Sequence, residues 1–278
     1  MPPPHHGFLA SADRIGAYAR AAEDAGFEYI WVFEHMVIPA GYSSRYPYNA
    51  EGRLHIEDED IPDPLALLAF LSGVTERINL GTGVLILPQR SPVLCAKECA
   101  TVDALSGGRL RLGIGVGWLR EEAEAVGTSF DDRGPRTDEA IEVMRALWRD
   151  GEATFDGRFT RFERAKSNPK PARRGGVPIL VGGHSRVAAR RAGRVGDGWF
   201  PIGLRGEDFA ARRDDMRAAA VAAGRDADTI EITYSGPAKA SLVARYADEG
   251  VDRWITPVWG ETLDDCRRDL DRVAAELT

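Results

Sequence analysis

Two adjacent side chains, Glu34 and His35, follow an apolar run over residues 29–33 that has the length of a buried strand. The carboxyl ends of parallel strands are where barrel proteins place their active sites. A histidine at such a position can take up or release a proton near neutral pH. A strand-end Glu-His pair can equally be two ordinary surface charges, and the residues alone favour neither interpretation.

A second candidate is the run Gly182-Gly183-His184-Ser185, which lies between an apolar run and a helical pattern. Ser185 is placed to cap the helix. The free amides of a first helical turn, together with the positive end of the helix dipole, form a seat for a phosphate group. A glycine turn that ends in an ordinary helix cap is the alternative.

Glycines recur in two predicted strands between residues 77 and 117. They are Gly81, Gly83, Gly113, Gly115 and Gly117. Glycine weakens a strand interior, so its repeated use indicates that something approaches the backbone closely. The pattern favours a flat ring lying on bare backbone, with tight barrel packing as the alternative. The spacing is not the dinucleotide fingerprint, which requires G-x-G-x-x-G at the start of a helix.

The elements that must position these residues alternate between strand and helix patterns. Strands are predicted near residues 30, 80, 112, 180, 200, 232 and 255, the second of them continuing through the apolar run 84–87. A helix over 93–105 should carry Leu94, Val102 and Leu105 on one apolar stripe. Seven strands in this order predict an α/β, TIM (β/α)8-type barrel whose first strand is missing.

No break in composition divides the chain, so residues 1–278 are predicted to form a single domain. Two insertions interrupt the alternation. One is a long polar loop over 39–62, a length typical of a lid or binding loop. The other covers 151–176 and has a hairpin pattern around Asp156-Gly157.

The composition excludes several classes of function. A net charge of −7 argues against a nucleic-acid or anionic-membrane surface. No apolar run has the length of a membrane span, and the N-terminus does not resemble a signal peptide. The three cysteines lack metal-ligand spacing, and the adjacent His5 and His6 would point apart on a strand, so no metal site is predicted. We therefore expect a cytoplasmic protein with reduced thiols.

Four segments together resemble the luciferase-like monooxygenase superfamily, in particular its branch of probable F420-dependent oxidoreductases. They are AEDAGFEYIWVFEHMVIP, INLGTGVLILPQRSP, ATVDALSGGRLRLGIGVGWLREE and ILVGGHSRVAARRAGRVGDGWF, in that order. The resemblance implies a TIM-type barrel with a flavin or deazaflavin across its C-terminal mouth, and often a homodimer. Members usually begin with a K-F-G-x-x-L-P strand, which is absent here, and we expect the natural start to lie upstream.

The resemblance also assigns roles to residues. His35 would lie beside the coenzyme ring and hand a proton to the substrate, while Glu34 would orient His35 or hydrogen-bond the ring. Gly83-Val84 corresponds to a non-proline cis peptide behind the ring. The loop from Gly182 through Gly183 and His184 to Ser185 would hold the coenzyme phosphate.

Three further residues, Gly115, Gly117 and Trp118, would line the ring site at the end of their strand. Some sugar-phosphate dehydrogenases of the superfamily carry a catalytic glutamate where this chain has Trp118, which argues against a sugar phosphate substrate. Glu121 and Glu122 follow, and their position favours solvated side chains at a helix start.

The resulting hypothesis is an oxidoreductase that transfers hydride between coenzyme F420 and a small organic substrate. The main alternative is an FMN-dependent luciferase-like monooxygenase. A noncatalytic flavin-binding relative, or a truncated inactive one, is the second alternative. No recognisable motif in the 39–62 loop identifies the substrate.

Overall fold

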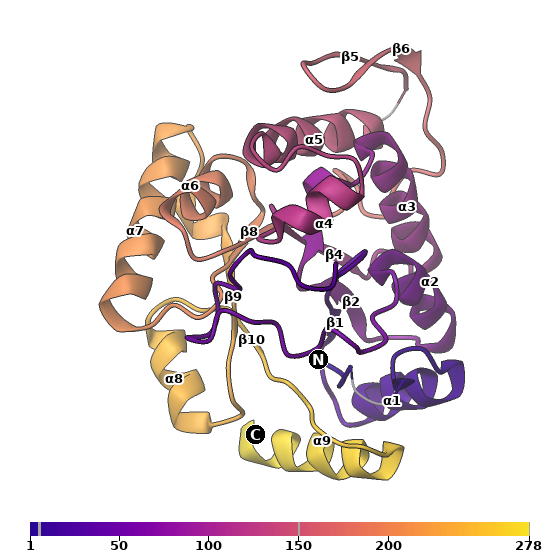
Figure 1. The fold of residues 1–278 in the computed structure, drawn as a ribbon, viewed down its shortest axis with the longest axis vertical. Coiled ribbons are helices and arrows are strands. Elements are labelled where there is room, and N and C mark those ends of the chain that lie inside the picture. Colours follow the sequence, from indigo (N-terminus) through magenta and orange to yellow (C-terminus); the bar gives the residue numbers. More distant parts are fainter. Residues whose placement is uncertain (5–6, 150, 278) are drawn as a thin grey trace.

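The computed structural model of the protein describes residues 1–4, 7–149 and 151–277, so His5 and His6 lie outside the described residues. Its centre is a parallel sheet curved into a nearly closed barrel (Figure 1). The strands follow the order β1 (Tyr29–Val32), β2 (Asn79–Thr82), β4 (Leu110–Gly115), β7 (Ile179–Gly182), β8 (Gly198–Phe200), β9 (Glu231–Ser235) and β10 (Arg253–Ile255). The predicted seven-stranded barrel is confirmed.

Helices connect the strands and surround the barrel (Figure 1), as parallel pairing requires. They are α1 (Ala12–Asp24), α2 (Pro64–Val74), α3 (Pro92–Leu105), α4 (Arg120–Ala125), α5 (Arg133–Trp148), α6 (Arg186–Val195), α7 (Gly206–Ala222), α8 (Ala240–Asp248) and α9 (Leu263–Leu277). Within the described residues, none of them is long and apolar enough to span a membrane.

The predicted stripe on α3 is wrong. Leu94 and Leu105 are 56% and 67% exposed, and only Val102 of the three is buried. The buried face instead carries small side chains, Cys95 and Cys99 among them, because α3 packs tightly against its neighbours. Apolar residues occur on both faces of this helix, so its periodicity does not identify the inner one.

The predicted strand over residues 78–87 is interrupted. β2 ends at Thr82, and a two-residue strand, β3 (Leu85–Ile86), then pairs with β4 before the 3₁₀ turn η2 (Leu87–Gln89). The Gly83–Val84 peptide bond between β2 and β3 is cis, which confirms the expectation for this position.

The sheet is open between β1 and β10, which form its two edges. A cavity of about 100 Å³ lies between these strands, with Trp31 and Trp254 in its wall. Just beyond the carboxyl end of β10, the Met1 amine donates to the Thr256 carbonyl (3.0 Å), and the Val258 amide donates to the Met1 carbonyl (3.0 Å). The gap thus falls where the sequence lacks a first strand.

The predicted hairpin is present as β5 (Ala153–Asp156) and β6 (Arg161–Ala165), and it projects from the barrel beyond α5 (Figure 1). By contrast, the described residues between β1 and α2 form no helix or strand. This long loop lies over the barrel mouth and supplies part of the site described below.

The glycines of the strands make room for the protein's own atoms. A Cβ on Gly113 would lie 2.0 Å from the Thr82 carbonyl oxygen. A Cβ on Gly115 or Gly182 would lie 2.7 Å from a methyl group of Val84. At these positions tight barrel packing, the alternative interpretation of the sequence, accounts for glycine without a ligand.

We expect Gly113→Ala to lower the free energy of unfolding by about 3 kcal/mol, because the new methyl group would overlap backbone that cannot move alone. Chemical denaturation of the purified protein measures this loss. Gly73→Ala is the control, since nothing lies within 4 Å of its added Cβ in α2 and alanine favours a helix. Equal stability of the two variants would contradict the packing described for β2 and β4.

Candidate active site

A cavity of about 560 Å³ opens at the carboxyl ends of the barrel strands. Its wall is largely apolar and aromatic, with side chains from the long loop, such as Tyr46, Tyr48 and Ile56, on one side. The residues predicted from the sequence all line this cavity: Glu34, His35, Gly83, Val84, Gly115, Gly117, Trp118, Gly182, Gly183, His184 and Ser185. The fold therefore brings together the ends of β1, β4 and β7.

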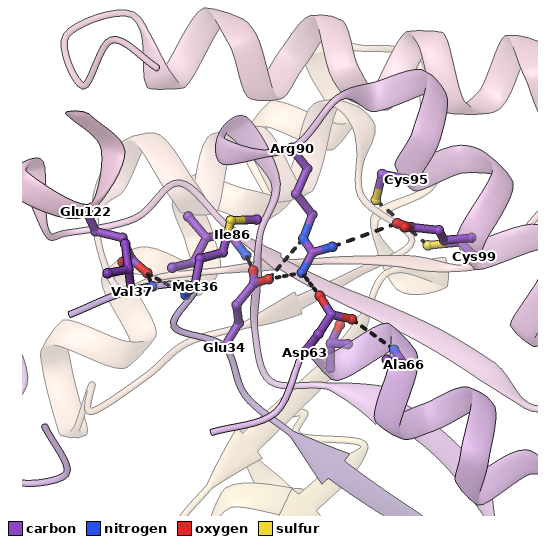
Figure 2. A network of polar contacts seen from close by, with 12 residues as sticks. Glu34, Met36, Val37, Asp63, Ala66, Ile86, Arg90, Cys95, Cys99 and Glu122 are labelled. Carbon is purple, nitrogen blue, oxygen red and sulfur yellow. Dashed lines mark hydrogen bonds and ion pairs between the residues drawn. The ribbon is translucent and has the colours of Figure 1, made fainter. Parts of the chain in front are cut away.

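The His35 ring is held by a carboxylate from α4. Its Nδ1 lies 3.0 Å from Glu122 Oε2, and Glu122 is fully buried. The other oxygen of Glu122 accepts from the Met36 amide (2.7 Å) and the Val37 amide (3.4 Å), as Figure 2 shows. An ionised carboxylate only accepts, so the neutral imidazole that suits this contact carries its hydrogen on Nδ1 and has the lone pair on Nε2.

Glu122 is the residue that the sequence interpretation missed, because it was expected to be solvated at a helix start. Its partners lie more than 80 positions earlier in the chain. The only local signal is the pair of adjacent acidic residues, Glu121 and Glu122, at the start of a short helix. That pattern is common on exposed helices and does not indicate burial.

Glu34 has different partners from those expected. Its carboxylate accepts from the Arg90 guanidinium (Nε at 2.9 Å) and from the Ile86 amide, and Arg90 also contacts Asp63 (Figure 2). Burial raises the pKa of Glu34, and the positive charge of Arg90 opposes this rise. The structure thus gives the orienting contact on His35 to Glu122, while Glu34 ties β1 to the turn after β3.

Aromatic rings surround Trp118 at the mouth of the cavity. Its ring centroid lies 5.9 Å from that of His35, 5.6 Å from Tyr42 and 5.2 Å from Tyr46, all edge to face. Such contacts fix ring orientations without using hydrogen bonds. Trp118 therefore links the wall that carries His35 to the long loop.

Glu121 fastens the same loop to α4. Its carboxylate accepts from the amide and hydroxyl of Ser43 (both 2.7 Å) and from the hydroxyl of Ser44 (2.7 Å). The serine hydroxyl groups, followed by the Ser43 amide, lower the pKa of Glu121 to about 2. The carboxylate is ionised throughout the neutral range and holds the loop there.

The Glu121 contacts should make a pH-dependent contribution to stability. A carboxyl whose pKa falls on folding stabilises the protein fully above its ordinary value of 4.5, and this stabilisation disappears as the pH falls toward 2. The difference in unfolding free energy between the wild type and Glu121→Gln should therefore shrink across this window. Thermal unfolding at a series of pH values measures it, and a difference independent of pH would refute the assignment.

The end of β7 and the start of α6 form the far end of the cavity. Ser185 accepts from the Ala188 amide (3.1 Å), which confirms the predicted cap. The Gly183 amide is not free, because it donates to the Phe200 carbonyl (3.0 Å). His184 Nδ1 is buried without a hydrogen-bond partner among the described residues. The Gly183 amide is therefore not available to a phosphate, in contrast to the amides of the helix's first turn.

Metal ligation has no support in the described parts of the chain. No group of three or more histidine, cysteine, aspartate or glutamate side chains there is arranged to hold an ion. Cys95, Cys99 and Cys266 are buried free thiols, with 4.0 Å between the first two sulfur atoms.

Known proteins resemble this chain in sequence and in fold. The family model for luciferase-like monooxygenases matches residues 2–268. An uncharacterised protein of Mycobacterium tuberculosis is 38% identical over 183 residues, covering 66% of this chain and 62% of that protein's own length. An FMNH2-dependent dimethylsulfone monooxygenase of Pseudomonas fluorescens is 35% identical over 207 residues, covering 73% of this chain and 52% of the relative.

Among solved structures, an F420-dependent secondary alcohol dehydrogenase in complex with an F420–acetone adduct has a TM-score of 0.76. It is 17% identical and covers 96% of this chain and 95% of its own. At that identity the similarity concerns the fold alone.

Proposed function

Because this chain belongs to the luciferase-like monooxygenase family, we propose that it is an oxidoreductase that transfers hydride between coenzyme F420 and a small organic substrate. The observation that carries the proposal is that His35, held by the buried Glu122, lies in the wall of an apolar cavity. Hydride transfer to or from a carbonyl group needs a partner that moves the accompanying proton, and His35 is that partner.

The residues present fit a coenzyme of the flavin type. The cavity volume of about 560 Å³ lies within the range of small-molecule sites. Val84, placed in the wall by Gly115 and Gly182, would support a flat ring, and the first turn of α6 would hold a phosphate. When bound, the deazaflavin ring of F420 supplies or accepts the hydride.

The protein's own residues would position the coenzyme and the substrate and move the proton that accompanies the hydride. Glu122 fixes the His35 tautomer, so that Nε2 is the nitrogen with a free lone pair; it makes no hydrogen bond within the described residues. In the direction of alcohol oxidation, Nε2 takes the hydroxyl proton, and in the reverse direction the imidazolium returns it. Aromatic side chains of the long loop, Tyr46 and Tyr48, line this region and would limit the access of water to a bound substrate.

FMN-dependent monooxygenation is the second candidate. It is favoured by the 35% identity to the dimethylsulfone monooxygenase, an FMNH2-dependent enzyme. The two candidates use the same cavity, and they differ in the coenzyme. A flavin-binding relative without catalytic activity is the remaining alternative.

A titration of the purified protein with F420 and, separately, with FMN tests the proposal. Micromolar or tighter binding of F420, with weaker binding of FMN, is the expected result, and tight binding also raises the melting temperature. Incubation of the F420 complex with a panel of secondary alcohols should then reduce the coenzyme. Preferential binding of FMN would instead support the second candidate, FMN-dependent monooxygenation. Binding without turnover of any substrate would favour the noncatalytic alternative.

We also propose that the protein forms a homodimer. Phe70 on α2 and Val93 and Leu94 on α3 are large apolar side chains that are at least 38% exposed. Exposed apolar side chains on neighbouring helices support an interface between copies. Light scattering after gel filtration would give the mass, and a monomer at micromolar concentration would remove this proposal.

A further inference from the structure

Arg133 is the first residue of α5, and it lines the cavity at the end where α6 begins. Its guanidinium carbon lies 3.7 Å from the centre of the Phe130 ring, and its Nη1 donates to the Phe130 carbonyl (2.8 Å). The next residue, Gly134, contacts α6 through a hydrogen bond from Arg191 to its carbonyl (3.3 Å). Arg133 is therefore held at the contact between α5 and α6.

Among the described residues, Arg133 has no carboxylate within ion-pair distance. Its Nε is buried without a hydrogen-bond partner there. Nearby arginines are all paired: Arg120 with Asp131 (2.6 Å), Arg136 with Asp132 (2.6 Å), and Arg191 with Asp138 (2.8 Å). Arg133 thus differs from these three arginines in having no carboxylate partner among the described residues.

This arrangement is unfavourable without a ligand. Burial, followed by the positive charge of Arg120, lowers the pKa of Arg133. A buried donor without an acceptor loses its hydrogen bonds to water and forms none within the protein, which costs free energy. A bound anion on the cavity side would remove both penalties, because it would supply a negative charge and an acceptor for Nε.

A second unsatisfied nitrogen lies at the same end of the cavity. His184 Nδ1 is buried without a partner in the described structure, and the His184 ring contacts Tyr48 edge to face. The amides of Arg186 and Val187, in the first turn of α6, have no intrahelical acceptor. One cation, one imidazole and two amides, pointing from different directions, suit a tetrahedral phosphate group better than a planar carboxylate.

We propose that Arg133 binds the phosphate group of the coenzyme, together with His184 and the first turn of α6. This inference rests on the proposed function, because the phosphate belongs to the coenzyme. Arg133 would use the Nε edge of its guanidinium, since Nη1 is occupied by the Phe130 carbonyl. The ring of Phe130 would keep the guanidinium plane in place before the coenzyme binds.

The test compares coenzymes with and without phosphate. Dissociation constants are measured by fluorescence titration for FMN and riboflavin, and for F420 and its deazaflavin core without the phosphate-linked tail. Arg133→Met should weaken binding of FMN and F420 by about 10- to 100-fold, the loss of a hydrogen-bonded charge pair. Riboflavin and the deazaflavin core should bind the variant and the wild type within about two-fold of each other.

Two further variants control the experiment. Arg136→Met removes an arginine one turn along α5 that pairs with Asp132 and is not in the cavity wall, and it should leave all four affinities unchanged. Arg133→Lys keeps the positive charge and should restore part of the lost affinity. Arg133→Lys also replaces Arg133→Met in the comparison if circular dichroism shows that Arg133→Met does not fold.

Several outcomes would overturn the inference. Equal weakening of the phosphorylated and unphosphorylated ligands would make Arg133 a residue of the ring site or of the fold. Unchanged affinity for both FMN and F420 would exclude a phosphate contact. Loss of affinity for F420 alone would mean that Arg133 contacts the tail of F420 beyond the phosphate. In these cases the wild type still binds a coenzyme and the proposed function stands. A wild type that binds neither FMN nor F420 would overturn both proposals.

Discussion

Replacement of His35 by asparagine is expected to lower kcat for hydride transfer by about 10²- to 10⁴-fold, the usual contribution of a positioned acid–base group. Asparagine carries an N–H donor near the position of Nδ1, so its contact with Glu122 is retained. It has no equivalent of Nε2 and cannot move the proton. Single-turnover absorbance changes of the coenzyme, with the substrate found in the alcohol panel, measure the rate.

The affinity of the coenzyme separates a catalytic loss from a binding loss. It should change little in His35→Asn, because the ring is supported from other walls of the cavity. His55→Asn is the matched control, since His55 is exposed on the long loop and pairs only with Glu51 there. A His35→Asn enzyme with the wild-type rate would show that the proton reaches the substrate by another route.

Replacement of Glu122 by alanine should lower the free energy of unfolding by about 3 kcal/mol. The change removes the acceptor for His35 Nδ1 and for the amides of Met36 and Val37, all from a fully buried position. Three donors at this partly buried position then lose their acceptor. Urea denaturation measures the loss, and Glu124→Ala, an exposed position on the same helix, should change stability by less than about 0.5 kcal/mol.

Glu122→Gln separates the structural role of the residue from its effect on the histidine. The amide keeps one oxygen for the Met36 backbone, so most of the stability should remain. Its NH2 group, turned toward His35, would favour the tautomer with hydrogen on Nε2, which is the wrong form for a base. Near-normal stability with a kcat lowered at least about 10²-fold is expected. A normal rate would mean that the tautomer does not matter.

Strand and helix positions were largely predictable, because alternating β and α patterns are local features of the sequence. Even so, Leu94 and Leu105 were placed on the wrong face of α3, since helix periodicity cannot tell two apolar faces apart. The site residues at the ends of β1, β4 and β7 were found for a related reason. Parallel strands bring their carboxyl ends together whatever the details of packing.

What the sequence could not reveal depends on contacts between distant segments. Glu122 looks like a solvated helix residue until the fold places it under His35. Glu34, next to His35 in sequence, was the natural candidate for that contact, but its carboxylate is bound by Arg90 and the Ile86 amide, which lie more than 50 positions later in the chain. The spacing of the glycines indicated a close approach correctly, while the approaching group at Gly115 and Gly182 is Val84 rather than a ligand.

The long loop is fastened by contacts other than those that hold His35. Ser43 and Ser44 are bound by Glu121, and the Tyr42 hydroxyl closes the far side by accepting from the Leu54 amide (2.9 Å) and donating to Glu57 (2.7 Å). Residues 45–53 therefore form a loop segment with both ends fixed, and its Tyr46 and Tyr48 line the cavity. His35 is held by Glu122, which lies outside this segment. Replacing residues 45–53 by other sequences is expected to change which molecules bind in the cavity, while His35 and Glu122 keep their contact.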